Sequence, residues 1–525
     1  MRGMHLCSLF LTAVLPIGAQ GLRELQTKIN QFTLANGMHF IVLERHDSPV
    51  VSFHLVVNAG SLNDPAGESG TAHMFERMAY KGTETIGSRS WPEEKKSLDA
   101  IEVAYDRLEA VANRAKAGQP QVDQTQVDQT QVDLARNQVN VAIDNAQRLS
   151  ASAEYRRILE ENGVPELGAQ VSGSATQFWY SLPSNRLELW FLMESQYLLH
   201  PVFREFYRER EASIEEYRQR VEGNPQGKML AELLANAFHA HPYGRPQNGW
   251  PSDTLSLRRP GLQAFFDRYF VPGSMTVAMV GDVTVADAKR LADRYFGPIP
   301  GRPAPAQRIA QEPPQNGPRS AIVEMAAPPF TLIGYKRPSQ YEADDVVLDV
   351  LYTMLSLGRS GLLYDSLIRE KRLAQQAAVQ ASMPEGRFPN LFVFLLLPAQ
   401  GRTVEENQRG LDEFLQRLKS VPVDAATLAR AKAQGMANLV RRSAGNREMA
   451  ALLAFQWASY GDLRKLFTYE DELNRVKPED VQRVVSRWFV ATGRTTLSTV
   501  PPGQSASQFN APPPKPAVLK SGGGQ

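Results

Sequence analysis

The chain begins with short runs of alternating hydrophobic and polar residues that predict β-strands. Residues 32–42 contain two such runs around an Asn-Gly pair, which predicts a strand, a tight turn and a second strand. Residues 51–57 alternate again and predict a half-buried strand. The segment 60–70 is rich in glycine, aspartate, proline and serine, so it predicts a loop, with a helix that starts near Ser69.

The pattern changes to a helical period between residues 91 and 163. Hydrophobic residues recur there at helical spacing, interrupted by the Gly-Gln-Pro of residues 118–120, and this predicts two helical arms. The second arm contains a short tandem repeat that starts at Gln121 and is too polar to form a core of its own. We therefore predict a protruding helical hairpin, 91–163, inserted in the first domain, and we expect the core to fold without it.

Strands and helices then alternate in both halves of the chain. Strands are predicted at 171–182, 275–280, 330–335, 391–397 and 495–500, and helices at 187–199, 204–220, 229–238, 262–270, 286–296, 344–355, 362–373 and 405–418. The stretch 297–318 is rich in proline, glycine and glutamine and predicts a linker. The sequence thus predicts two α+β domains of similar size, 20–296 and 319–500, an internal duplication, and a disordered tail at 501–525.

Composition excludes some classes of function. The chain has 525 residues, a hydrophobic fraction of 42% and a formal charge of +2. That hydrophobic fraction is typical of globular proteins, and so balanced a charge argues against nucleic-acid binding through a general basic field. No segment reaches the run of about 18 apolar residues that a membrane span needs.

Residues 1–19 have the pattern of a secretory signal. Arg2 supplies a positive start, an apolar run follows, and Ala19 offers a small residue for cleavage. The only cysteine, Cys7, lies inside this segment, so the mature chain would have neither disulfide nor thiolate chemistry. We expect an exported protein, periplasmic or secreted.

The most informative stretch is His73-Met74-Phe75-Glu76-Arg77. The pattern H-x-x-E-H places two histidines on one helix face, where both can hold zinc, with the glutamate as general base. Here the last position is Arg77. A guanidinium keeps its proton and has no lone pair to donate, so it cannot ligate zinc.

Several motifs together resemble those of the inverzincin peptidases, the pitrilysin/insulinase group, in their mitochondrial-processing-peptidase-like branch. They lie at 70–83, 209–216, 241–244, 281–283 and 358–374. The resemblance extends over about 32–500, apart from the inserted hairpin. It implies that each domain is a mostly antiparallel sheet with helices packed on one face.

The resemblance also implies roles for individual residues. His73 would be the first zinc ligand, Glu76 the base and Glu216 the third ligand, with Glu215 as the alternative if the register differs by one. Glu209 lies two helical turns earlier on the same face and matches a supporting carboxylate. The second ligand position is Arg77, which we expect to form an ion pair with Glu216 or Glu76 in place of the metal charge.

The second domain carries a further departure from the family pattern. Family members hold the substrate backbone with an Arg/Tyr pair; Arg369 matches the arginine, but Gln375 lies near the tyrosine position. Trp179 and Tyr180 match the strand beside the substrate, or they pack in the core as half-buried strands often require.

These departures favour a non-catalytic, zinc-peptidase-like subunit that pairs with an active homologous subunit, or with itself, around peptide substrates. No cofactor is expected for that function. One alternative is an active zinc metallopeptidase that recruits a replacement ligand, in which case zinc is expected. The other alternative is a stand-alone module that binds an extended peptide at a sheet edge.

Overall fold

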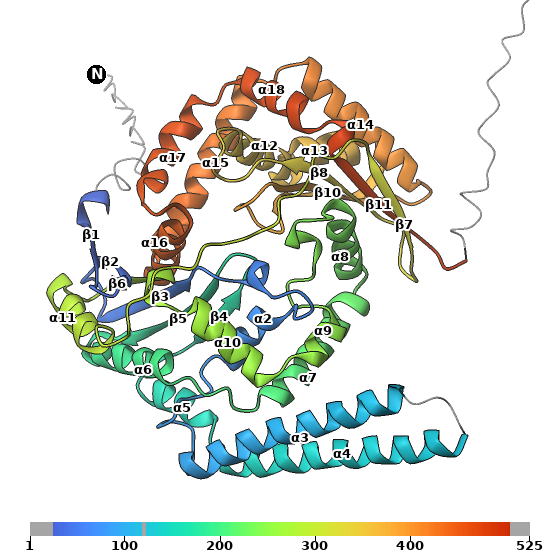
Figure 1. Ribbon diagram of the computed structural model, residues 1–525. Coiled ribbons are helices and arrows are strands. Elements are labelled where there is room, and N and C mark those ends of the chain that lie inside the picture. Colours follow the sequence, from blue (N-terminus) through green and yellow to red (C-terminus); the bar gives the residue numbers. More distant parts are fainter. Residues whose placement is uncertain (1–24, 118–121, 504–525) are drawn as a thin grey trace, which may run out of the picture. The chain divides into compact units, whose positions relative to one another are not determined.

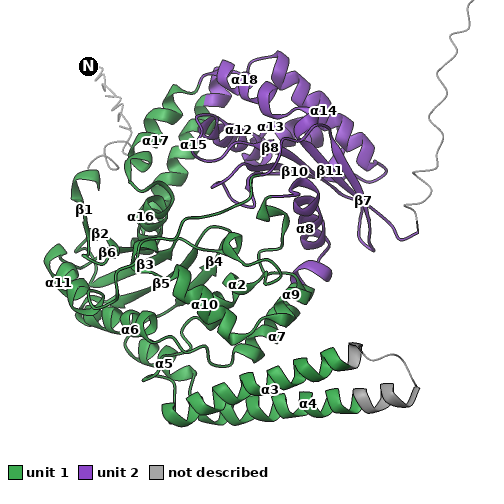
Figure 2. Cartoon of the chain, viewed as in Figure 1, with its two compact units in different colours: residues 1–218, 241–311, 429–476 green, residues 219–240, 312–428, 477–525 purple. Residues whose placement is uncertain are grey.

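The computed structural model describes residues 25–117 and 122–503 and divides into two compact units (Figures 1 and 2). Unit 1 comprises residues 1–218, 241–311 and 429–476, and unit 2 comprises residues 219–240, 312–428 and 477–525. The expected signal segment lies outside the described residues, as do most of the expected tail and the turn at 118–120. No helix of the described part of the chain is long and apolar enough to cross a membrane.

Unit 1 is built on a six-stranded sheet with the order β1-β2-β6-β3-β5-β4. Its strands are β1 (Ile29–Thr33), β2 (His39–Glu44), β3 (Val50–Val57), β4 (Leu167–Val171), β5 (Thr176–Pro183) and β6 (Met275–Gly281). All neighbouring pairs are antiparallel except β2 and β6, which are parallel. The mostly antiparallel arrangement is therefore confirmed.

Helices cover both faces of this sheet. The unit contains α2 (Thr71–Met78), α5 (Ala153–Glu161), α6 (Leu187–Leu199), α7 (Phe206–Tyr217), α9 (Pro251–Ser256), α10 (Arg259–Tyr269), α11 (Val285–Tyr295), α16 (Asn446–Tyr460) and α17 (Arg464–Arg475). On β3, Phe53 and Leu55 join the core beneath α2, α6 and α10, whereas Val56 packs against Leu453 of α16. The expectation of helices on one face was therefore incomplete, because α16, from a distant part of the sequence, covers the other face. For the same reason β3 is buried on both sides and not half-buried.

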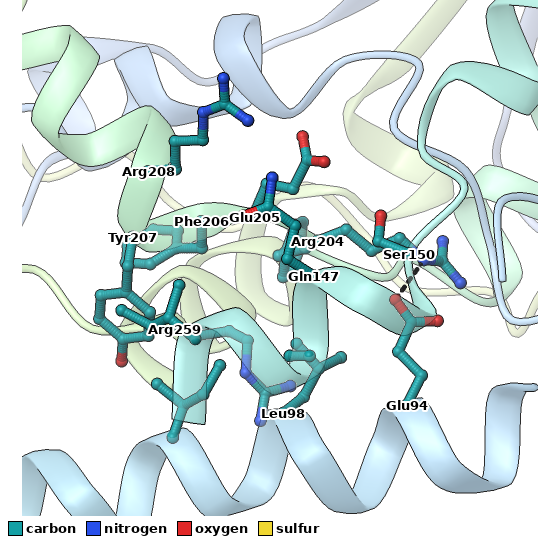
Figure 3. A pocket seen from close by; sticks show the side chains of 14 residues that line it. Glu94, Leu98, Gln147, Ser150, Arg204, Glu205, Phe206, Tyr207, Arg208 and Arg259 are labelled. Atoms are coloured by element: carbon teal, nitrogen blue, oxygen red, sulfur yellow. Dashed lines mark hydrogen bonds and ion pairs between the residues drawn. The ribbon is translucent and has the colours of Figure 1, made fainter. Parts of the chain in front are cut away.

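The inserted segment does form a helical hairpin, α3 (Trp91–Ala117) and α4 (Val122–Leu149). Its base belongs to the core: Leu98 and Ile101 are buried there, and Figure 3 shows Glu94 reaching Arg204. This pair is fully buried, with Arg204 Nε 2.8 Å from Glu94 Oε1. The hairpin thus packs on the core, contrary to the expectation of a separable insert.

Unit 2 is built on a five-stranded sheet with the order β7-β11-β8-β10-β9. Its strands are β7 (Arg319–Glu324), β8 (Thr331–Arg337), β9 (Ala374–Met383), β10 (Asn390–Pro398) and β11 (Arg494–Val500). Its helices are α8 (Pro225–Ala237), α12 (Asp344–Ser356), α13 (Leu362–Tyr364), a π-helical turn (Asp365–Glu370), α14 (Val404–Ser420) and α18 (Pro478–Trp488), while α15 (Ala425–Ala444) crosses from unit 2 into unit 1.

This second sheet is also covered on both faces. Tyr335 of β8 contacts Phe489, just after α18, and the adjacent Gly334 faces Leu233 of α8 on the opposite side. Helix α8 comes from the first half of the sequence, just as α16 of unit 1 comes from the second. Neither helix could be assigned to its sheet from position along the chain.

The two sheets repeat one topology. Leaving out β1, the strands of the first sheet lie in the order first-fifth-second-fourth-third of their chain order, and so do the strands of the second. In each sheet the last strand enters beside the first and runs parallel to it. The α+β fold with two related sheets is therefore confirmed.

Candidate functional site: a substituted metal centre

Helix α2 carries the motif and is anchored at its first turn. The Asp64 carboxylate accepts hydrogen bonds from the backbone N–H groups of Gly70 and Ala72, both at 2.8 Å. Burial raises the pKa of Asp64 to about 7. Gly70 has a φ of 97°, and an added Cβ would lie 2.9 Å from the Thr254 hydroxyl oxygen, so a side chain does not fit there.

The motif helix separates an apolar face from a polar one. Phe75 packs among aromatic rings that include Phe203 and Phe270, and Met74 and Met78 are buried with it. The polar face consists of His73, Glu76 and Arg77, and it lies toward α7 and β4. The helical period explains this division, because residues three or four apart share a face.

His73 lies between two carboxylates. Its Nδ1 is 3.7 Å from Glu76 Oε2, and its Nε2 is 3.5 Å from Glu216 Oε2. The ring is buried, and Nε2 makes no hydrogen bond. Glu76 Oε2 accepts a hydrogen bond from the Val171 N–H at 3.2 Å, so the expected base contacts the backbone of the edge strand β4.

Arg77 contacts the two glutamates that the resemblance singled out on α7. Its Nη1 lies 2.8 Å from Glu216 Oε2, and its Nη2 lies 2.9 Å from Glu209 Oε2. The expected ion pair with Glu216 is therefore present, whereas no ion pair joins Arg77 to Glu76 in the part of the chain that the structure describes. Glu215 points away, exposed and close to Arg218, so Glu216 is the glutamate that faces this cluster.

The charge pairing continues past the end of α2 to the residue that caps the start of α7. Lys81 Nζ contacts Glu205 and Glu209, each at 2.8 Å. Burial alone would lower the pKa of Lys81, but these hydrogen bonds hold it above its usual value. For Glu205 the directions are reversed. Burial alone would raise its pKa, but the hydrogen bond from Lys81 holds the pKa below its usual value. We call this alternating series, Glu216, Arg77, Glu209, Lys81 and Glu205, the charge ladder.

The residues of the site do not fit a catalytic zinc ion. Such a site needs about three protein ligands with free lone pairs. The Arg77 guanidinium has none, and it hydrogen-bonds the Glu216 oxygen that a metal would need. Across residues 25–117 and 122–503, no group of three or more histidine, cysteine, aspartate or glutamate side chains is placed to hold a metal.

An open pocket of about 480 Å³ borders the charge ladder. Glu76, Arg77 and Lys81 line one side of it, and Leu167 and Ala169 of β4 line another. A backbone edge next to a pocket is the arrangement that binds extended peptides by strand addition.

The sequence pattern did not single out Lys81, Glu205 or Asn248. Asn248 Nδ2 lies 3.5 Å from Glu216 Oε1. Lys81 follows Arg77 by four residues, and Glu205 precedes Glu209 by four, so the matched spacing of opposite charges could have revealed the charge ladder. Nothing local marks Asn248, because its loop reaches α2 only through the fold.

The substrate-holding positions of the second domain lie in unit 2. Arg369 belongs to the π-helical turn and forms an ion pair with Asp365, Nη1 to Oδ1, at 3.2 Å. Gln375 is exposed on the edge strand β9. Trp179 stacks on His54, and Tyr180 is buried in the core. The expected substrate role of Arg369 stays a prediction.

Two family models match the chain. Residues 40–128 match the insulinase domain of peptidase family M16, and residues 256–434 match the domain described as the M16 inactive domain. The chain belongs to the M16 peptidase family. Its fold and the His73 motif agree with this membership, and the expected resemblance is confirmed.

Similar proteins extend over nearly the whole chain. A zinc protease, PqqE, of Helicobacter pylori is 24% identical over 90% of this chain and 93% of its own. A mitochondrial-processing peptidase subunit beta of Lentinula edodes is 20% identical over 90% of this chain and 91% of its own. The crystal structure of a protease from Helicobacter pylori superposes with a TM-score of 0.73 and 22% identity, over 90% of this chain and all of that one. This M16 chain is therefore zinc-peptidase-like in sequence and fold.

Proposed function

We propose that this M16 chain is an exported, non-catalytic subunit that pairs with an active homologous subunit and helps to bind peptide substrates. The ion pair between Arg77 and Glu216 is the observation that carries this proposal. It places a permanent cation where a second metal ligand would be needed. Arg77 neutralises Glu209 and Glu216 of α7, so these side chains do not fit the zinc ion that supplies the Lewis acid of a zinc peptidase.

One comparison supports a subunit, and the sequence supports export. A relative of nearly the same length is named a subunit. The segment 1–19 has the pattern of a secretory signal, which supports export.

Zinc content and activity test the absence of catalysis. The purified chain is expected to contain little zinc by elemental analysis and to show no chelator-sensitive peptidase activity. Near-stoichiometric zinc, with activity lost on Glu76→Gln, would establish the active-peptidase alternative instead.

Arg77→His tests the ligand assignment directly. The new imidazole would join His73 and Glu216 as a three-ligand set, so zinc affinity should rise by roughly tenfold or more. Arg218→His, at an exposed arginine close to Glu215, is the matched control and should change nothing. If zinc affinity does not rise in Arg77→His, either the assignment of Glu216 is wrong or the site has collapsed.

Partner binding tests the subunit role. Co-expression with a homologous chain that carries an intact H-x-x-E-H motif should give a stable heterodimer with more peptidase activity than that chain alone. A monomer that ignores such a partner and still binds extended peptides would favour the second candidate, a stand-alone peptide-binding module. The observation that favours this second function is the edge strand β4, which lines the open pocket.

A further inference from the structure

The outer half of the hairpin carries a groove that the M16 site does not use. Helices α3 and α4 lie side by side in Figure 1, and the chain enters and leaves them at the bridged residues Ser88 and Ser150. An open groove of about 480 Å³ runs between the helices. It is lined by Val103, Asp106, Arg107, Ala110, Val111, Arg114, Gln131, Leu134, Ala135 and Gln138.

The exposed residues along this groove follow a heptad spacing. On α3, positions 103, 107, 110 and 114 are separated by four, three and four residues; on α4, positions 131, 134, 138 and 141 are separated by three, four and three. This is the spacing of the a and d positions of a coiled coil, but only Val103, Ala110, Leu134 and Val141 are apolar; arginine and glutamine occupy the other four positions, and Val141 lies just beyond the lining residues. The two stripes are separate from the seam that joins the two arms, where Ala104, Ala135 and Val139 are buried.

The apolar members of these stripes are largely open to solvent. Val103 is 52% exposed, Leu134 is 53% exposed and Val141 is 58% exposed. Single exposed hydrophobic residues are ordinary. Three of them on neighbouring heptad stripes form instead a surface that an additional helix could cover with knobs-into-holes packing.

The charges beside the groove specify the partner. Arg107 and Arg114 both line it, and neither has a carboxylate within ion-pair distance among the described residues, although the Arg114 Nε donates to the Ala110 carbonyl at 3.2 Å. The one lining acid, Asp106, is already paired with Arg258 at 3.1 Å. The groove therefore offers two unneutralised cations one heptad apart.

We propose that this groove docks an amphipathic helix of a partner protein, one with apolar residues at heptad spacing and acidic residues opposite Arg107 and Arg114. The partner helix would complete a three-helix bundle with α3 and α4. The two arginines would set its register, because opposite charges across a coiled-coil seam select partner and alignment. This docking does not depend on the proposed catalytic inactivity.

The test uses two synthetic helical peptides of about three heptads with the same apolar residues, one flanked by glutamate and one by lysine. Fluorescence anisotropy would measure their binding to the full chain. The acidic peptide should bind, more weakly as salt rises, and the basic peptide should not. The double variant Arg107→Glu/Arg114→Glu should weaken acidic-peptide binding by about tenfold or more and favour the basic one.

Leu134→Asp should abolish binding of the acidic peptide, because it places a charge on the apolar stripe. Val421→Asp is the matched control, since Val421 is 55% exposed but lies off the hairpin, and it should bind like the parent. Circular dichroism would check that each variant keeps its helices. Equal binding of both peptides, no binding, or binding unaffected by the arginine or Leu134 changes would overturn the proposal. Concentration-dependent dimers in sedimentation, lost on Leu134→Asp, would also overturn it, in favour of a second copy of this chain.

Discussion

The two sheets share one strand order, yet they differ in the helix that follows the second strand along the chain, β3 in unit 1 and β8 in unit 2. In unit 1 this helix is α2, which carries His73 and Arg77 beside an open pocket. In unit 2 it is α12, which carries Asp345 and Asp349. Both helices face a cluster of opposite charges, so the common fold permits such a cluster at this place without making it a functional site.

The two clusters differ in burial. In unit 2, Arg337 has a side chain only 2% exposed and pairs with Asp345 and, at 3.6 Å, with Asp349. In unit 1, Arg77 is 22% exposed and borders the pocket. A buried arginine that pairs with acids stabilises the fold, whereas a half-buried one beside a pocket can be substituted at a lower cost in stability. The charge ladder is therefore the more open of the two clusters.

The largest expected effect concerns the hairpin, which unit 2 lacks. Replacing residues 91–163 with a short Gly/Ser loop should cost most of the soluble protein, because it exposes the core around Leu98 and leaves Arg204 buried without Glu94. Replacing only residues 108–138 should leave a cooperative thermal transition. Comparable soluble yield from both variants would show that the base of the hairpin is dispensable after all.

Arg337→Met should destabilise unit 2 by about 3 kcal/mol, since it removes a buried guanidinium that pairs with the largely buried Asp345. Denaturant unfolding followed by circular dichroism would measure this. Arg417→Met, at an exposed position of α14, is the control and should fall within about 0.5 kcal/mol of the parent. A small loss for Arg337→Met would remove the contrast in burial on which the comparison rests.

Buried Glu194 should give unit 1 a pH dependence that the charge ladder does not. Burial raises the pKa of Glu194 from 4.5 to about 7, although the hydrogen bond from the Tyr155 hydroxyl acts to lower it. The folded state therefore binds a proton that the unfolded state releases. The resulting stability is present below pH 4.5 and is lost as the pH rises through about 7.

Glu194→Gln should reduce this dependence by on the order of 3 kcal/mol between the two ends of that window, and should leave the contribution of Asp64, whose pKa burial also raises to about 7. Chemical unfolding at a series of pH values would measure it, with Glu188→Gln as the exposed control. An unchanged pH profile in Glu194→Gln would assign the dependence to other groups.

The smallest expected effect is on the charge ladder itself. Arg77→Met should cost only about 1 kcal/mol of stability, because Arg77 is half-buried and Lys81 still neutralises Glu209. The melting temperature would show this beside that of Arg337→Met. A loss as large as that of Arg337→Met would mean that the charge ladder is a structural clamp like its counterpart in unit 2.

The sequence by itself predicted the family, the α+β class and a motif helix in which Arg77 occupies a ligand position. Strand alternation, the helical period of the hairpin and the spacing of His73, Glu76 and Arg77 are local patterns, and they survive in a single sequence because neighbouring residues share a face or alternate between faces. The sequence predicted that Arg77 would pair with Glu216 or Glu76, since a carboxylate at a site without its metal needs a cation, and the structure shows the pair with Glu216.

Only the tertiary structure decided which distant segments meet. Helix α16 covers the first sheet and α8 the second, and no local pattern assigns a helix to a sheet built from the other half of the chain. The same holds for Glu94 with Arg204 and for Asn248 with Glu216. Such contacts depend on the path of the whole chain. Packing depends on which surfaces fit together in space and not on how far apart they are in the sequence.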